Sequence, residues 1–144
     1  MIIKFVSSED IYPLRHKILR PHRHYEEIIY DTDDELNTFH VGAYLNGKLV
    51  GIVSFNQDNI EDFPGIHYRL RAMAVLPEYR ENHIGRKIVE FGISFLKEKS
   101  ADIVWCKGRV SVQGYYEKMG FKSYGEIFDY PGLGAHIILY NELI

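Results

Sequence analysis

The segment from residue 66 to residue 99 constrains the fold of this chain more than any other. It begins with a strand-like run, IHYRLRAMAV, and continues through a turn that holds arginine, histidine and glycine, PEYRENHIGR. From about Ile84 to Lys99 apolar residues then recur at helical spacing, with charged residues between them. A strand that leads through a glycine-bearing turn into a helix presents unpaired backbone amides to an anion. The segment therefore predicts a strand–turn–helix unit with an anion site at the turn.

The chain after this helix supplies a second strand, a second helix and a hairpin. The run DIVWC, residues 102–106, is apolar and indicates a buried strand, so a right-handed strand–helix–strand crossover is expected. The run SVQGYYEKMG predicts a helix that ends at Gly120, a typical left-handed cap. Strands around 124–130 and 135–143, joined through residues 131–134, close the chain.

The chain before residue 66 reads as a strand, one or two short helices and a hairpin. Residues 1–6 indicate the strand, and Asp10 is the expected N-cap of the next helix because Pro13 is tolerated only in a first turn. That helix should end at Arg20-Pro21, and residues 21–30 can hold a second short helix. Runs 38–45 and 49–55 flank Asn46-Gly47, a strong hairpin signal, and residues 56–65 are a polar loop.

These elements predict the fold class. An antiparallel meander, one strand–helix–strand unit and a closing hairpin make an α/β protein, three-layer α/β/α with a central mixed, mostly antiparallel sheet. The 144 residues contain no repeat or linker, so we expect a single domain over 1–144.

Composition narrows the classes of partner and location. The net charge of −3 argues against nucleic acid, which normally requires a basic surface. No apolar run approaches the roughly 20 residues of a membrane span and no signal peptide is present, so a cytoplasmic protein without membrane contact is expected. The single cysteine, Cys106, excludes an intramolecular disulfide and a multi-cysteine zinc site. His22 and His24 lack further ligands at convincing spacing, so no metal is expected.

The turn at 80–86 has the chemistry of a diphosphate site. Backbone N–H groups at a helix start point outward unpaired, and the helix dipole favours an anion there. Arg80, His83, Arg86 and Lys87 add side-chain donors. The three-glycine dinucleotide fingerprint and the Gly-Lys-Ser/Thr nucleotide loop are both absent. An ordinary helix can also start with basic residues and a glycine, so the turn alone does not decide the ligand.

Two segments in order carry a family resemblance. VLPEYRENHIGRKIVEFG resembles the coenzyme A loop of the GNAT superfamily of N-acetyltransferases, Gln/Arg-x-x-Gly-x-Gly/Ala, with Arg80 first and Gly85 last. YYEKMGF, residues 115–121, resembles a later helix of the same family. His83 stands at the position of the middle glycine of this pattern. Histidine is enriched at positive φ, so the turn can keep its conformation. Arg109 stands where many members carry an asparagine that contacts pantetheine. The resemblance spans about residue 41 to the end and implies the acyl-CoA N-acyltransferase fold.

The resemblance also implies an activity: acetyl transfer from acetyl-CoA, as cosubstrate, to an amine of a small molecule or peptide by direct attack in a ternary complex. The alternative is a catalytically silent coenzyme A sensor or scaffold of the same fold, and a homodimer is left open. The residues expected at the cosubstrate are Met73, Ala74, Val75, Arg80, Glu81, Asn82, His83, Ile84, Gly85, Arg86, Lys87 and Tyr116.

The resemblance gives Tyr116 the catalytic role of proton donor to the departing sulfur, although its helical spacing also suits the core. Tyr115 is expected to pack. The glutamate that serves some relatives as a base corresponds to Arg69, so the base is unassigned, with His67 and His136 acting through water as candidates.

The acceptor side offers three candidate residues. Arg69 and Arg71 alternate onto one strand face, where they either pair with acids of neighbouring strands or form a cationic wall for a substrate carboxylate or phosphate. His22 lies in an exposed loop that we expect to line the acceptor cleft. Cys106, inside an apolar strand, is expected to be inert packing.

Overall fold

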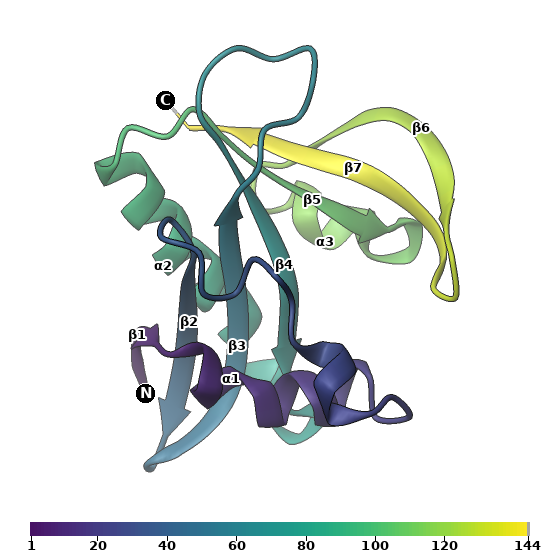
Figure 1. Cartoon of the computed structure of the whole chain (residues 1–144). Helices are drawn as coiled ribbons and strands as arrows, with labels where there is room; N and C mark the ends of the chain where they lie inside the picture. The colour runs from purple at the N-terminus through teal and green to yellow at the C-terminus, as the bar shows by residue number, and fades with distance from the viewer. Residues whose placement is uncertain (144) are drawn as a thin grey trace.

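The fold is a single seven-stranded mixed sheet with helices on both faces. A computed structural model describes residues 1–143. The strand order is β1-β2-β3-β4-β5-β7-β6, and every neighbouring pair is antiparallel except β4 and β5 (Figure 1). The strands are β1 (Ile2–Val6), β2 (Phe39–Leu45), β3 (Lys48–Gln57), β4 (His67–Val75), β5 (Ile103–Arg109), β6 (Lys122–Tyr130) and β7 (Gly134–Glu142). The predicted mixed, mostly antiparallel sheet is confirmed.

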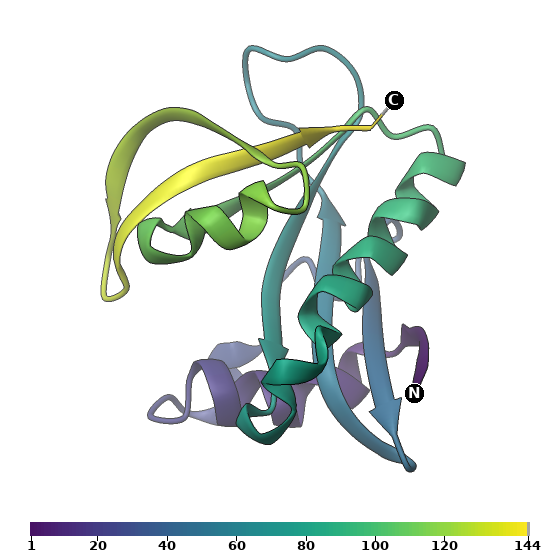
Figure 2. The ribbon, with the colours of Figure 1, turned by 180° about the vertical axis from the view of Figure 1, so that it is seen from behind.

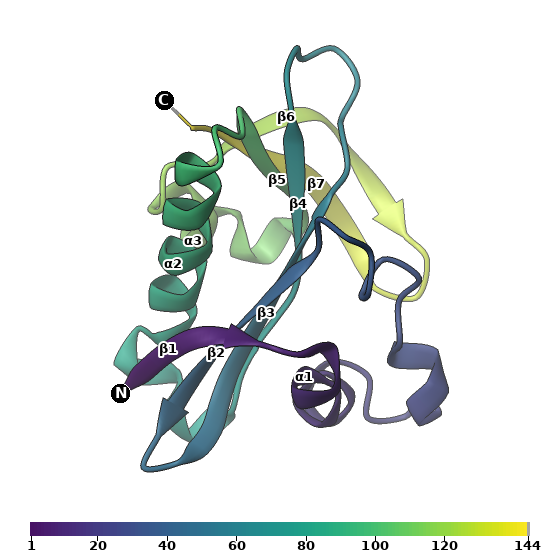
Figure 3. The ribbon, with the colours of Figure 1, turned by 60° about the vertical axis from the view of Figure 1, so that its left-hand side comes forward.

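The helices form the outer two of three layers. They are α1 (Ser8–Leu14), η1 (Arg15–Leu19), η2 (Tyr25–Ile28), η3 (Pro77–Asn82), α2 (Ile84–Glu98), η4 (Val110–Val112) and α3 (Gln113–Glu117). The long helix α2 crosses one face of the sheet, and α1 lies on the other (Figures 2 and 3). Within residues 1–143, no helix combines the length and apolar character that a bilayer span requires.

The main core lies between α2 and the sheet. Ile84, Ile88 and Leu96 are fully buried and pack with residues of β2, β3 and β4. Gly92 faces the buried ring of Phe55, and a Cβ at this position would overlap that ring. The missing side chain therefore lets α2 lie close to β3.

The first helix starts earlier than the sequence predicts. Ser7, not Asp10, is the N-cap, and the two residues form a reciprocal capping box in which each side chain accepts the other's backbone N–H. Pro13 consequently lies in the second turn, where its missing N–H breaks the regular helical ladder. The chain then widens into the π-helix η1, which ends at Leu19, just before Arg20-Pro21 as predicted.

Other turn predictions are confirmed. Asn46 and Gly47 both adopt positive φ, 51° and 79°, as a tight hairpin between β2 and β3 requires. Gly120 has φ 95°, the left-handed conformation expected after the helix. That helix is shorter than predicted, because residues 110–112 form a 3₁₀ turn and only Gln113–Glu117 is α-helical.

The feature that creates a site is the divergence of β4 and β5. They pair only where His67–Arg69 lies beside Ile103–Trp105, and β5 then turns away with β7 and β6 (Figure 1). A bulge in β4, with Ala72 at φ 56°, accompanies the divergence. Residues 70–75 therefore have β3 on one side and no strand on the other.

Candidate active site

A cavity of about 810 Å³ lies where β4 and β5 separate. Residues 69–75 of β4 and 106–109 of β5 form its two sides. The start of α2 and the helix α3 reach it from one face, and η1, Tyr30 and the β6–β7 hairpin reach it from the other. The volume is in the range of small-molecule sites.

The start of α2 presents free backbone amides to this cavity. His83, the N-cap residue, is left-handed at φ 55°, as its place in the turn predicts, and its side chain is exposed. The N–H of Lys87 bonds to the carbonyl of His83, so the amides of Ile84, Gly85 and Arg86 precede the first helical hydrogen bond. Three unpaired amides at the positive end of a helix dipole have the chemistry that an anion site requires.

Not every residue predicted at the cosubstrate lines the cavity. Those that do are Met73, Ala74, Val75, Arg80, His83, Gly85, Arg86 and Tyr116. The side chain of Ile84 is fully buried in the core, so only its backbone is available. Glu81, Asn82 and Lys87 are exposed and lie outside the lining.

The bulge at Ala72 divides β4 into two halves with different orientations. Leu70 and Met73 both face the core under α2, although they are three residues apart and a regular strand would put them on opposite faces. Arg69 and Arg71 consequently point to the face opposite α2. The strand thus contributes to both faces: Leu70, Met73 and Val75 face the α2 side, whereas Arg69, Arg71 and Ala74 face the α1 side.

Tyr116 is buried on the α2 side of the sheet and lines the cavity. Its ring packs over Gly108 of β5 and lies edge-on to Phe121, with ring centres 5.5 Å apart. Burial raises the pKa of Tyr116 far above its ordinary value, and Cys106 and Tyr115 raise it further. Its hydroxyl is therefore protonated at any physiological pH and can act as a donor.

Tyr115 has a second contact beyond packing. Its ring meets that of Tyr116 at 5.6 Å, but its side chain is 40% exposed, and a Cβ on Gly85 would lie 2.6 Å from its hydroxyl oxygen. Burial raises the pKa of Tyr115, while Arg86 lowers it. Tyr115 therefore lies over the turn at residues 80–86. The sequence predicted only that Tyr115 packs, and it did not predict this contact.

The two candidate histidines occupy different places. His67 is fully buried, and its ring nitrogens bond to the carbonyl of Pro64 and the amide of Ile60, so it holds the 56–65 loop. His136 lines the cavity, lies opposite Arg109 in the β5–β7 register, and its Nδ1 lies 2.9 Å from the carbonyl of Gly134. Of these two histidines, only His136 lines the cavity.

Cys106 is buried, as expected for packing, although it also borders the cavity. Burial raises the pKa of its thiol to about 12. Among residues 1–143, no group of three His, Cys, Asp or Glu side chains lies close enough to hold a metal ion.

Arg69 and Arg71 stack on aromatic rings instead of pairing with acids. The guanidinium of Arg69 lies 5.4 Å from the ring centre of Trp105, and that of Arg71 lies 4.0 Å from the ring centre of Tyr30. Neither forms an ion pair within residues 1–143, so the predicted alternative of pairing with neighbouring acids is wrong.

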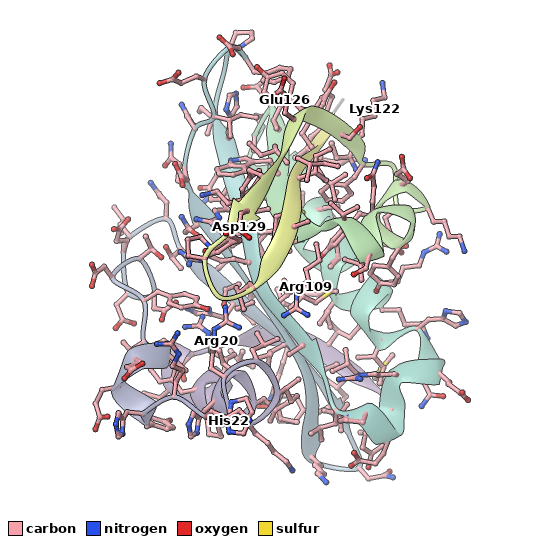
Figure 4. All side chains as sticks on the ribbon, turned by 90° about the vertical axis from the view of Figure 1, so that its right-hand side faces the viewer. Arg20, His22, Arg109, Lys122, Glu126 and Asp129 are labelled. Carbon is pink, nitrogen blue, oxygen red and sulfur yellow. The ribbon has the colours of Figure 1, made fainter. Side chains whose placement is uncertain are left out.

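His22 does not line the cavity; it is exposed in the turn after η1 (Figure 4). In the same view Arg20 lies on the N-terminal helical segment, and Arg109 lies between that segment and the tip of the β6–β7 hairpin. Arg20 and Arg109 both line the cavity.

A buried polar network that the sequence did not indicate positions Tyr30. Both oxygens of Asp33 accept from Arg15, at 2.7 and 3.0 Å, and Arg15 also donates to Ser54 and to the carbonyl of Ile28. The N–H of Tyr30 donates to Asp33, and the Arg15 guanidinium lies 4.0 Å from the Tyr30 ring centre. The hydrogen-bond partners of Arg15 lie 13 to 39 residues from it in the chain, so no local pattern could have revealed them.

Comparison with known proteins bears directly on this geometry. The family described as Acetyltransferase (GNAT) matches residues 7–121. Over 142 residues the chain is 41% identical to an uncharacterized N-acetyltransferase, YitI, of Bacillus subtilis strain 168, covering 98% of this chain and 95% of that protein. The predicted resemblance is therefore confirmed.

Solved structures share the fold at low identity. The ribosomal-protein-S18-alanine N-acetyltransferase of Escherichia coli superposes with a TM-score of 0.76 at 18% identity, covering 99% of this chain and 93% of that one. An aminoglycoside 6'-N-acetyltransferase complexed with coenzyme A gives 0.73 at 17%, covering 100% and 98%. At these identities the likeness shows the fold alone.

Proposed function

The chain belongs to the acetyltransferase (GNAT) family, and from this premise we propose that it moves the acetyl group of acetyl-CoA to an amine by direct attack within a ternary complex. The observation that carries the proposal is that one cavity connects three features: the free amides at the start of α2, the unpaired edge of β4, and Tyr116. Each suits one part of an acetyl-CoA molecule.

The start of α2 holds the diphosphate. The amides of Gly85 and Arg86 donate to its oxygens, and the helix dipole stabilises its charge. Arg80, whose Nε donates to the carbonyl of Val75 at 3.2 Å, is anchored beside the end of β4 with its remaining donors available. A solved neighbour of the same fold was crystallised in complex with coenzyme A.

The free edge of β4 holds the thioester. Backbone N–H groups in residues 72–75 that have no partner strand on the β5 side can donate to the thioester oxygen. Fixing the thioester next to the amine lowers the activation free energy by roughly 7 to 11 kcal/mol in favourable cases.

Tyr116 completes the chemistry. The amine nitrogen forms a bond to the carbonyl carbon, the carbon–sulfur bond breaks, and the Tyr116 hydroxyl gives its proton to the sulfur. The amine loses a proton to solvent or to a base reached through water, and Tyr116 regains a proton from solvent, so that amine and thioester become amide and thiol. Because burial raises the pKa of Tyr116, its hydroxyl is protonated when the carbon–sulfur bond breaks, and it can donate to the sulfur.

The test is Tyr116→Phe, assayed as thiol release from acetyl-CoA with a panel of amines. We expect kcat to fall about 100-fold or more, with the Kd for acetyl-CoA unchanged by calorimetry. Tyr124→Phe is the matched control, because its hydroxyl bonds to Asp62 outside the cavity. Equal turnover by the Tyr116 variant and the parent would reject the role of Tyr116.

The same assay separates an enzyme from a silent coenzyme A module. Either protein should gain roughly 2.7 kcal/mol of stability from acetyl-CoA at about 100 times its Kd. Only an enzyme releases free thiol faster when an amine is added. Binding without release for every amine would favour a sensor or scaffold.

A further inference from the structure

Four cationic side chains converge on the face of the cavity opposite α2. Arg69 and Arg71 reach it from β4, and Lys107 and Arg109 reach it from β5, each pair two residues apart on its strand. The last paired position of the two strands is Arg69 beside Trp105, so the other three residues lie just beyond it, where the strands separate. We name these four residues the cationic cluster. Not one Asp or Glu is among the residues that line the cavity.

The charge of the cationic cluster is not neutralised by the protein. None of its four members forms an ion pair in the part of the chain that the structure describes. The Nε of Arg69 is buried without a hydrogen-bond partner. A buried donor left unpaired costs free energy, and so do two like charges in a partly buried site. In a protein of net charge −3, such a site is explained by a ligand that supplies the missing anion.

Three of the four side chains lie against aromatic rings. Tyr30 lies under Arg71, Trp105 under Arg69, and the ring centre of Tyr130 lies 5.8 Å from the Lys107 ammonium. Contact with the face of an aromatic ring does not use up the N–H donors of a guanidinium, which can still bind carboxylate and phosphate in bidentate fashion. The aromatic rings thus preorganise the donors without consuming them.

The charges of the cationic cluster shift the pKa values of Arg71 and Tyr130. Burial lowers the pKa of Arg71, and the neighbouring Arg69 lowers it further. Burial alone would raise the pKa of Tyr130, but the Arg69 guanidinium beside its hydroxyl, together with Arg71 and Lys107, brings it below its usual value. A field that favours a tyrosinate favours any other anion placed at the same position.

The cluster also lies on the acceptor side of the reaction centre. Arg71 directly precedes the bulged Ala72. Met73 and Val75, after the bulge, face the α2 side, where the turn at residues 80–86 lies. An anion bound by Arg71 is therefore next to the thioester but on the opposite face of the sheet from α2.

We propose that the acceptor is an amine that also carries a carboxylate or phosphate, and that the cationic cluster binds this anionic group. The inference rests on the proposed acetyl transfer for its direction of attack. The same field repels acceptors with several positive charges, such as polyamines and aminoglycosides.

The experiment compares matched acceptors by thiol release: methionine with methioninamide, and O-phosphoethanolamine with ethanolamine, with spermidine as the polycation. We expect kcat/KM to be at least about 30-fold higher for an anionic member than for its neutral partner, the loss expected when one side of a buried charge pair is removed. The amide has the less basic amine, so chemistry alone would favour the amide. A carboxylate preference without a phosphate preference assigns an amino-acid-like acceptor, and the reverse assigns a phosphorylated amine.

Substitutions in the cationic cluster test whether these residues bind the anionic group of the acceptor. Arg71→Gln should raise the KM of the anionic acceptor at least about 30-fold and change the neutral one by less than about twofold, and Arg71→Lys should restore part of the loss. Lys107→Gln tests the cluster at an exposed position that does not endanger folding. Arg23→Gln, which removes an exposed ion pair outside the cavity, is the control and should have no effect.

A binding arm separates this inference from the proposed function. With saturating coenzyme A, the melting temperature is measured with each acceptor. Selective stabilisation by anionic members without turnover would support the cluster and reject acetyl transfer. Turnover with equal kcat/KM within each pair, a preference for spermidine, or neither binding nor turnover of any anionic member would overturn the inference.

Discussion

Replacing Asp33 with asparagine tests whether the buried pair with Arg15 holds the N-terminal segment on the sheet. The Arg15 side chain is fully buried and that of Asp33 is 2% exposed, with donor–acceptor distances of 2.7 and 3.0 Å. Asn keeps the volume but removes the charge, leaving a buried guanidinium without a counterion.

The magnitude follows from the remaining contacts. Breaking a buried pair typically costs about 3–5 kcal/mol. Arg15 keeps its bonds to Ser54 and to the carbonyl of Ile28, and the Asn amide oxygen can accept one more, so we expect about 3 kcal/mol. For a chain of 144 residues the unfolding entropy near the midpoint is about 0.3 kcal/mol/K, so Tm should fall by about 10 °C.

The pH dependence has a definite sign. Burial would raise the pKa of Asp33, but the hydrogen bonds from Arg15 and from the Tyr30 amide lower it more. The stabilisation is therefore fully present above the unfolded pKa of about 3.9 and is lost as the pH falls through the lower folded pKa. The stability difference between parent and variant should shrink as the pH falls below that value.

Urea unfolding followed by circular dichroism measures this effect. The variant should have a lower midpoint and an unchanged slope. Glu27→Gln is the control, because its pair with Arg23 is exposed and should contribute less than about 1 kcal/mol. A variant within about 1 kcal/mol of the parent at pH 7, or a difference that grows on acidification, would refute the reasoning.

The same substitution has a functional consequence. Asp33 accepts the N–H of Tyr30, and Tyr30 lies under Arg71. We expect the Asp33 variant to raise the KM for an anionic amine while the Kd for acetyl-CoA stays unchanged. A loss of acetyl-CoA affinity would place the network in the cosubstrate site instead.

Three further predictions follow from single contacts. Gly85→Ala puts a Cβ 2.6 Å from the Tyr115 hydroxyl oxygen and over the free amides, so the Kd for coenzyme A by calorimetry should rise about tenfold; an unchanged Kd would remove the turn from the diphosphate site. Gly92→Ala overlaps the buried Phe55 ring and should cost about 1–3 kcal/mol in urea unfolding, whereas a neutral result would mean that α2 can shift freely. Cys106, with a pKa of about 12, should react with iodoacetamide at pH 8 far more slowly in the folded protein than in urea by mass spectrometry; comparable rates would contradict its burial.

The parts of the site that were predictable from sequence are local ones. Gly85 and His83 lie in the turn that the strand–turn–helix pattern predicts, and His83 adopts the positive φ expected of it. Tyr116 lines the cavity, in agreement with its place in the YYEKMGF segment. Turn geometry and helix starts depend on neighbouring residues, so a short window contains the information.

The residues on the acceptor side of the cavity could not be predicted from short segments of the sequence. Tyr30 takes the place at the cavity that was expected for His22, and it is held by a pair, Arg15 and Asp33, that lies 18 residues apart in the chain. The N-cap of α1 was also predicted wrongly. Asp10 is a residue type that caps helices, but Ser7 is the N-cap, because the side chains of Ser7 and Asp10 each accept the other's backbone N–H.

By itself, the sequence determined the order of the elements, the α/β class and the glycine-bearing turn before α2, because periodicity and turn chemistry act over a few residues. The tertiary structure decided where β4 and β5 separate, how the bulge at Ala72 turns Arg71 and Met73 to opposite faces, and which aromatic rings hold the arginines. Those outcomes depend on contacts between strands and on burial, which exist only once distant parts of the chain pack together.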